Sequence, residues 1–169
     1  MKVSMGKYYK NGADRKVKVH IDPYDVWNMD HTLALIIHPM LVELKKDKHG
    51  APVVDDEDVP EELRSVGADP FIDEDTGEPD DHLDCHFFKR WDWVLDEMIW
   101  AFGEYTQDWE EQYHTKKDPA DVIPENRTDG LNGLGLNEWS YDVVGQKAHG
   151  DRIANAIRLF GKYYGCLWD

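Results

Sequence analysis

One face of a predicted long helix combines aromatic, basic and acidic side chains. Arg90, Trp93, Glu97 and Trp100 follow one another at spacings of three or four residues, so they share one side of that helix. Tryptophan rings attract cations and stack on planar groups. An arginine guanidinium binds phosphate or carboxylate groups through paired hydrogen bonds. This face is therefore predicted to line a binding site.

Two further donors, His149 and Arg152, stand near the start of the predicted last helix, beside its apolar stripe. Imidazole and guanidinium groups at the edge of a core suit an anionic ligand. They are equally suited to pair with the many carboxylates of the chain. Together with the first face they complete the predicted ligand-binding set: Arg90, Trp93, Glu97, Trp100, His149 and Arg152.

The candidate metal ligands are His82 and His86 in "HLDCH", which stand four residues apart. If this segment is helical, both imidazoles project from one face, as they do in helical zinc sites. Asp92 and Asp96 have the same spacing and would suit Mg²⁺. No complete ligand set is evident, so the cofactor stays open, with zinc and magnesium as candidates.

The composition narrows the range of partners. The chain has 169 residues, a net charge of -16 and two cysteines. Neutralisation of phosphates needs clustered Lys and Arg, so direct nucleic-acid binding is not expected. An acidic surface could instead occupy the nucleic-acid groove of a basic protein. The longest apolar stretch, 33–37, is too short to span a membrane, and we expect a soluble intracellular protein.

The periodicity predicts a mainly α (α+β) fold, with three principal helices packed as one compact domain, a small N-terminal β-hairpin and long acidic loops. An Asn-Gly pair between two β-prone runs predicts the hairpin, and "DVPEEL" predicts a short helix capped by Asp58. The predicted segments of the domain 1–169 are a hairpin with a turn (1–27), a helix (28–47), an acidic irregular segment (48–83), a long helix (84–113), a second irregular segment (114–145) and a last helix with its tail (146–169).

Each predicted helix also carries an apolar stripe that we expect to face the core. The stripes are Leu33, Ile37, Met40 and Leu44; Phe88, Trp91, Leu95, Met98, Phe102 and Tyr105; and Ile153, Ala156, Ile157, Phe160 and Tyr164. The tryptophan-bearing face lies opposite the second stripe. Three explanations of that face stay open: it is covered by protein with Arg90 and Glu97 paired, it forms a pocket wall, or it forms a dimer contact.

Three blocks of the sequence resemble a family of short proteins encoded by tailed bacteriophages. The blocks are "DPYDVWNMDHTLALIIHPMLVELKKDKHGAPVVDDEDVPEELRS", "RWDWVLDEMIWAF" and "KAHGDRIANAIRLFGKYYGCLWD". They cover just under half of the chain, and the segment 106–140 lies outside them. The family has no assigned activity, so the resemblance transfers no catalytic residue. It implies an accessory protein that acts in the cytoplasm of an infected bacterial host.

Small acidic phage proteins of this kind often counter host defence, and two mechanisms suit the sequence. In the first, the protein sequesters a small anionic, nucleotide-type immune signal. Trp93 or Trp100 would stack on the base, and the basic side chains of the set would hold phosphate. In the second, the acidic surface inhibits a host protein, in the manner of a nucleic-acid mimic. A metal-assisted hydrolase is the less favoured class, and a homo-oligomer stays open.

Overall fold

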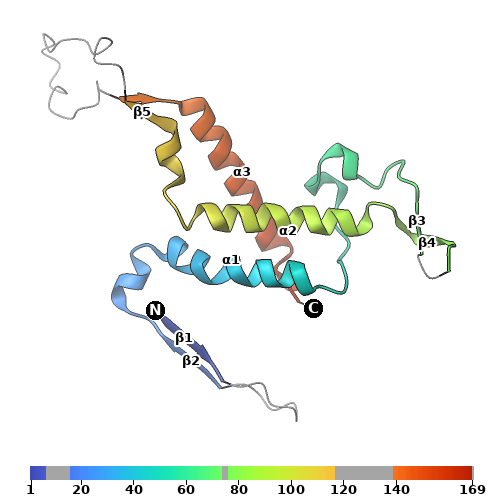
Figure 1. Cartoon of the computed structure of the whole chain (residues 1–169), viewed down its shortest axis with the longest axis horizontal. Helices are drawn as coiled ribbons and strands as arrows, with labels where there is room; N and C mark the ends of the chain where they lie inside the picture. The colour runs from blue at the N-terminus through green and yellow to red at the C-terminus, as the bar shows by residue number, and fades with distance from the viewer. Residues whose placement is uncertain (7–15, 74–75, 117–138, 169) are drawn as a thin grey trace, which may run out of the picture.

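Three helices form the body of the molecule, and the second in sequence lies between the other two. The computed structural model describes residues 1–6, 16–73, 76–116 and 139–168. Helix α1 spans Met29–Asp47, α2 spans Phe87–Glu104 and α3 spans Val143–Lys162. Helix α2 packs against both α1 and α3 (Figure 1). The predicted α+β class, with three principal helices and an N-terminal hairpin, is confirmed.

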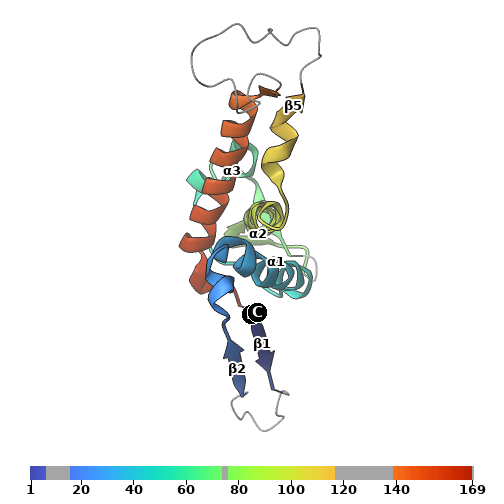
Figure 2. The ribbon, with the colours of Figure 1, turned by 90° about the vertical axis from the view of Figure 1, so that its left-hand side faces the viewer.

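The strands described form three separate two-stranded antiparallel sheets. β1 (Lys2–Met5) pairs with β2 (Val17–His20), β3 (Pro70–Ile72) with β4 (Pro79–Asp84), and β5 (His114–Lys116) with β6 (Trp139–Tyr141). The N-terminal hairpin extends away from the helices (Figure 2), and its predicted turn lies outside the described residues. The other two sheets fall in segments predicted to be irregular, and there the prediction is wrong. Their strands are short and lack the alternating apolar pattern that identifies a strand in a sequence.

Helix α2 is shorter than the predicted helix 84–113 at both ends. Residues 79–84 belong to β4, and His86 is the N-cap of α2. At the other end, the carbonyl of Gly103 accepts hydrogen bonds from the backbone N–H (3.0 Å) and the hydroxyl (2.6 Å) of Thr106. The chain then turns, and the 3-10 helix η4 (Trp109–Tyr113) packs against α3. This turn brings Trp109 and Tyr113 to the start of α3.

The other two helices lie close to their predicted positions. Helix α1 continues through Pro39. Helix α3 begins before the predicted position 146, because the side chain of Asp142 accepts a hydrogen bond from the N–H of Gly145 (2.8 Å) and caps the helix. No helix among the described residues is long and apolar enough to cross a lipid bilayer.

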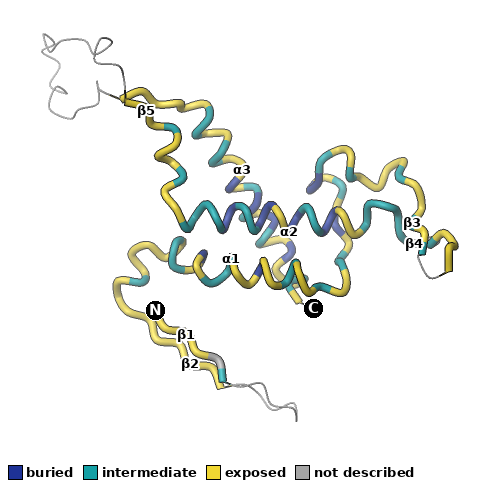
Figure 3. The backbone as a smooth tube through the Cα atoms, in the orientation of Figure 1, coloured by how far each residue is buried: buried dark blue, intermediate teal, exposed yellow. Residues whose placement is uncertain are grey.

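The core follows α2, where the buried residues are concentrated (Figure 3). The predicted stripe of α2 is buried at Trp91, Leu95, Met98 and Phe102, whereas Phe88 is 37% exposed. Most sides of α2 are covered because α1 and α3 flank it. From α3 and its C-cap, the buried core residues are Ile153, Ala156, Leu159 and Tyr163.

Helix α1 buries a face that overlaps the predicted stripe only in part, since Ile37 and Leu44 of that stripe pack against the core at half burial. Ala34 and Leu41 are buried against the rest of the core, whereas Leu33 and Met40 are 40% and 65% exposed. Ala34 belongs to the same core cluster as Trp91 and Leu95 of α2. Helix α1 therefore carries two neighbouring apolar faces, and the core covers only one of them completely.

Asp58 connects the segment between α1 and α2 to the end of α3. It lies in the short 3-10 turn η2 (Asp56–Asp58), is 4% exposed and does not cap the following turn η3 (Glu61–Leu63). Instead its carboxylate accepts hydrogen bonds from Lys162 (2.5 Å) and the Tyr163 hydroxyl (2.7 Å), and it pairs with Arg158 (2.7 Å). The predicted capping role of Asp58 is wrong, because three donors of α3 and its C-cap hold the carboxylate.

Candidate functional site

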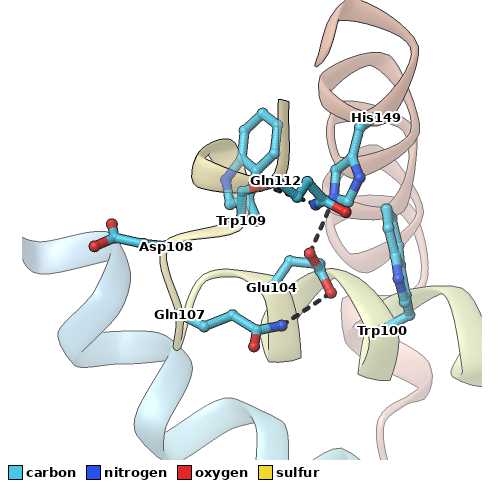
Figure 4. A pocket seen from close by; sticks show the side chains of 7 residues that line it. All are labelled: Trp100, Glu104, Gln107, Asp108, Trp109, Gln112 and His149. Atoms are coloured by element: carbon cyan, nitrogen blue, oxygen red, sulfur yellow. Dashed lines mark hydrogen bonds and ion pairs between the residues drawn. The ribbon is translucent and has the colours of Figure 1, made fainter. Parts of the chain in front are cut away.

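A depression of about 370 Å³ opens where the end of α2, the helix η4 and the start of α3 meet (Figure 4). Its walls are the half-buried indoles of Trp100 and Trp109, and its floor and rim carry carboxylate, amide and imidazole groups. The lining residues are Trp100, Glu104, Gln107, Asp108, Trp109, Gln112 and His149. Four of the six predicted ligand-binding residues lie in or beside this depression: Glu97, Trp100, His149 and Arg152.

His149 is the centre of this cluster. Its ring stacks on Trp109, with the centroids 4.6 Å apart and the planes at 6°, and its distance to the Trp100 ring is 5.0 Å. Nε2 lies 3.0 Å from a carboxylate oxygen of Glu104, and Nδ1 lies 2.9 Å from the hydroxyl of Tyr113. The Glu104 contact is an ion pair when the ring is protonated, and Nε2 makes no hydrogen bond with a described residue; the roles of Nδ1 and the Tyr113 hydroxyl as donor and acceptor follow from the tautomer. His149 thereby joins α2, η4 and α3.

The row Tyr113–His149–Glu104 has the order of a hydroxyl, a base and a group that orients the base, as nucleophilic sites do. In this protein, however, Trp109 stacks on the ring of His149 and Trp100 packs against it at a tilt of 46°. Each member of the row also comes from a different element of the fold. The arrangement therefore supports a positioning role, in which the row holds Trp109 in place as a wall of the depression.

Arg152 and Glu97 form the second interaction that fixes this region. The guanidinium donates to both carboxylate oxygens of Glu97, from Nε at 3.0 Å and from Nη2 at 2.7 Å. Its carbon Cζ also lies 3.8 Å from the centroid of the Trp100 ring, a cation–π contact. The hydrogen bonds to Glu97 raise the pKa of Arg152 above its ordinary value. The positive charge of Arg152 is therefore already compensated within the protein.

The other two predicted ligand-binding residues lie away from this site. Arg90 is 4% exposed and donates to both oxygens of Asp84, at 2.9 and 2.7 Å, and to the carbonyl of Leu63, at 3.1 Å. The hydrogen bonds from Arg90 lower the pKa of Asp84 below its ordinary value. The predicted pairing of Arg90 with Glu97 is wrong, because β4 places Asp84 closer. Trp93 is half-buried and packs against the main core.

A second depression, of about 540 Å³, adjoins the first and shares Gln107, Asp108 and Trp109 with it. We call the two together the acidic cleft. It is lined by Asn28, Asp30, His31, Trp100, the segment Glu104–Glu110, Gln112 and His149. This lining carries four carboxylates, and none of the described residues that form it is Lys or Arg. The electrostatic potential of the cleft therefore favours a cation.

Three of the four carboxylates are available to a ligand. Asp30, Asp108 and Glu110 are exposed, and none of them forms an ion pair with another described residue. The fourth, Glu104, is bound by His149. Sequence periodicity alone assigns residues 108–110 to the long helix and gives them no role. The signal that points to them is the pair of aromatics Trp109 and Tyr113, four residues apart after the break at Gly103.

The predicted metal ligands do not converge. His82 lies on β4 and His86 is the N-cap of α2, so the two do not share a helical turn, and the helical metal site is wrong. Asp92 and Asp96 pair instead with Lys48 (2.9 Å) and Lys45 (2.5 Å). Among the described residues, no group of three or more His, Cys, Asp or Glu side chains is arranged to hold a metal ion.

Comparisons of the chain with protein-family models, with curated proteins and with solved structures found no match. The resemblance to bacteriophage proteins therefore stays a prediction. The functional conclusion depends on the residues and the geometry of the acidic cleft.

Proposed function

We propose that this protein binds a basic segment of a partner protein in the acidic cleft. The observation that carries the proposal is the lining itself: four carboxylates and the rings of Trp100, Tyr105 and Trp109, without Lys or Arg among the described lining residues. Carboxylates and aromatic faces together are the groups that recognise ammonium and guanidinium ions. The cleft therefore matches the side chains of lysine and arginine.

The shape of the cleft adds to this argument. Two depressions of about 370 and 540 Å³ share one wall, formed by Asp108 and Trp109. Two basic side chains of one segment fit such a pair of depressions, one in each, with the shared wall between them. Each ion pair at an exposed carboxylate contributes about 0.2–1 kcal/mol, and each cation–π contact about 0.5–1 kcal/mol. Salt should therefore weaken the binding strongly.

The resemblance to bacteriophage proteins supports a host protein as the partner. A net charge of -16 attracts basic proteins at long range, and many basic host proteins bind nucleic acid. In this proposal the phage protein inhibits such a protein by occupying its basic segment. The biological role is that of an accessory inhibitor, consistent with counter-defence.

Sequestration of a nucleotide-type signal is the second candidate for the same cleft. One observation favours it: the guanidinium of Arg152 is half-exposed and lies on the Trp100 ring, where a base and a phosphate could both be bound. Two observations disfavour it. The same guanidinium is held by Glu97, and three carboxylates that form no ion pair with any described residue would repel phosphate. The cleft therefore favours a basic segment over a nucleotide as its ligand.

One binding experiment separates the two candidates. A fluorescent Lys/Arg-rich peptide and a panel of cyclic nucleotides are titrated with the protein at low and at high salt. We expect the peptide to bind at low salt and to be released at high salt, with no binding of the nucleotides. Binding of a nucleotide without binding of the peptide would reverse the order of the two candidates, and binding of neither would refute both.

A matched pair of variants localises the binding. The double variant Asp108→Asn, Glu110→Gln removes two charges from the cleft, and we expect it to weaken peptide binding about tenfold. The control, Glu61→Gln with Glu62→Gln, removes the same charge from exposed positions on η3. Its affinity should stay within about twofold of the wild type. Equal losses in the two double variants would mean that only the net charge matters, which contradicts the assignment of the site.

A further inference from the structure

An apolar groove of about 580 Å³ lies between α1 and the end of α3, and it shares no residue with the acidic cleft. Ile37, Met40 and Leu44 line it from α1, and Phe160 and Tyr164 line it from the other side. Met40 is 65% exposed and Tyr164 is 67% exposed. These three α1 residues belong to the stripe that the sequence predicts as a core face. Ile37, Leu44 and Phe160 pack at half burial against the main core, so the chain covers this core-type surface only in part.

The N-terminal hairpin presents a second apolar surface that is largely exposed, although Val3 borders a depression lined by Leu35 and Ile36 of its own α1. Val3 pairs with Val19 across the strands, and Val17 lies on the same face as Val19. The three valines are 46%, 57% and 55% exposed. The opposite face carries Lys2 and Lys18. A two-stranded hairpin is marginally stable in water without a surface to cover its apolar face, so this one requires such a surface.

The two surfaces have complementary shapes. One is a groove and the other is a narrow arm that extends from the body of the molecule (Figure 2). The hairpin and the C-terminus, which follows the groove-lining end of α3, lie on the same side of the helices in both views (Figures 1 and 2). Within one chain the arm leaves the groove open, as the exposure of Met40 and Val19 shows.

We propose that the groove receives the valine face of the hairpin from a second copy of this chain, and that the exchange is reciprocal. A two-fold dimer of this kind covers both surfaces of both copies and leaves no site for a third copy. A different partner in the groove would leave the hairpin uncovered.

Charge favours the same occupant. The described residues of the hairpin include Lys2, Lys16 and Lys18 and no Asp or Glu, whereas the whole chain has a net charge of -16. Two such chains repel each other overall. The hairpin is a basic part of each copy, so it is attracted to the acidic body of the other. This proposal is independent of the proposed function, because the groove and the acidic cleft are separate.

The test is the mass of the full chain in solution, measured by light scattering or native mass spectrometry over a range of concentrations. We expect twice the chain mass of 19.7 kDa for the wild type. Met40→Glu in the groove and Val19→Lys in the arm should each give a monomer with an unchanged circular dichroism spectrum. Val66→Glu is the control, since Val66 is 87% exposed elsewhere on the surface, and it should stay dimeric.

Mixing the two monomeric variants tests the exchange itself. In the mixed dimer, the unchanged arm of the Met40→Glu chain meets the unchanged groove of the Val19→Lys chain. At the other contact, the introduced lysine faces the introduced glutamate. We therefore expect a heterodimer to form from the two monomers. A monomeric wild type would overturn the proposal, and so would a dimer that Met40→Glu disrupts while Val19→Lys leaves it intact.

Discussion

Replacement of Asp58 by Asn should destabilise the fold measurably, because this buried carboxylate holds the segment between α1 and α2 against α3. The substitution keeps the size of the side chain and removes its charge. Lys162 and Arg158, which lie 2.5 and 2.7 Å from the carboxylate, lose their counterion, and the Tyr163 hydroxyl loses a charged acceptor. The substitution therefore affects three charge-assisted interactions of Asp58, a residue that is only 4% exposed.

The magnitude follows from the exposure of the partners. Removal of one member of a fully buried ion pair costs about 3–5 kcal/mol. Here the Lys162 and Arg158 side chains are 30% and 49% exposed, so water compensates part of the loss. Lys162 also keeps its contact with Asp55 at 2.7 Å. We therefore expect a loss of about 2–3 kcal/mol in the free energy of unfolding at pH 7, or a fall in Tm of about 5–10 °C.

The pH dependence gives a second, independent check. Burial raises the pKa of Asp58, but the hydrogen bonds from Lys162, Tyr163 and Arg158 outweigh it and hold the pKa below the ordinary 3.8. Because the folded-state pKa is depressed, this stabilisation is complete above about pH 4 and is lost as the pH falls through the folded-state value. The difference between wild type and variant should therefore shrink in acid.

The assay is urea denaturation followed by circular dichroism at pH 7, 5 and 3. The control is Asp47→Asn, because Asp47 is exposed and lies 3.7 Å from Lys46 at the surface; it should change the free energy of unfolding by less than about 0.5 kcal/mol. Two results would refute the reasoning: an Asp58→Asn variant as stable as the control at pH 7, or a difference from wild type that stays constant down to pH 3.

Two further substitutions test the fold around the candidate site. Gly145→Ala should lower the free energy of unfolding by about 1–3 kcal/mol, because an added Cβ would overlap the capping carboxylate of Asp142 and the ring of Tyr113. Helix propensity alone predicts that alanine stabilises the helix. The change in melting temperature therefore shows which of the two effects is larger. Arg90→Met should cost about 2–4 kcal/mol in urea denaturation at pH 7, since Asp84 loses both hydrogen bonds of the guanidinium. A loss below about 1 kcal/mol in the second case would show that the buried pair is dispensable.

The sequence was sufficient to identify the three helices. Trp91 and Leu95 belong to a regular stripe, and Trp100 with Glu97 lies on the opposite side of the same helix, so coverage of both sides by protein was one of three predicted explanations. The same reasoning identifies His149 and Arg152 as candidate site residues, because they flank the buried stripe of α3. Local periodicity determines such features, and it can be read from the chain.

The remaining features depend on contacts between distant segments. Arg90 pairs with Asp84 because β4 bends the chain before α2, and the acidic strand residues show no strand pattern. Helix α1 has apolar residues on two faces, and periodicity cannot tell whether Leu41 or Met40 meets the core. The role of Trp109 depends on the turn after Gly103, a residue that is compatible with both continuation and termination of a helix.

The most direct test of the acidic cleft is a titration of the isotope-labelled protein with a Lys/Arg-rich peptide, followed through the indole N–H signals of its seven tryptophans. Assigned spectra report each ring separately. We predict that the signals of Trp100 and Trp109 shift with the peptide, that those of Trp93 and Trp168 do not, and that the shifts diminish as salt is added. Shifts confined to tryptophans outside the cleft, or shifts of Trp100 and Trp109 with a cyclic nucleotide but not with the peptide, would contradict a cleft built for basic segments.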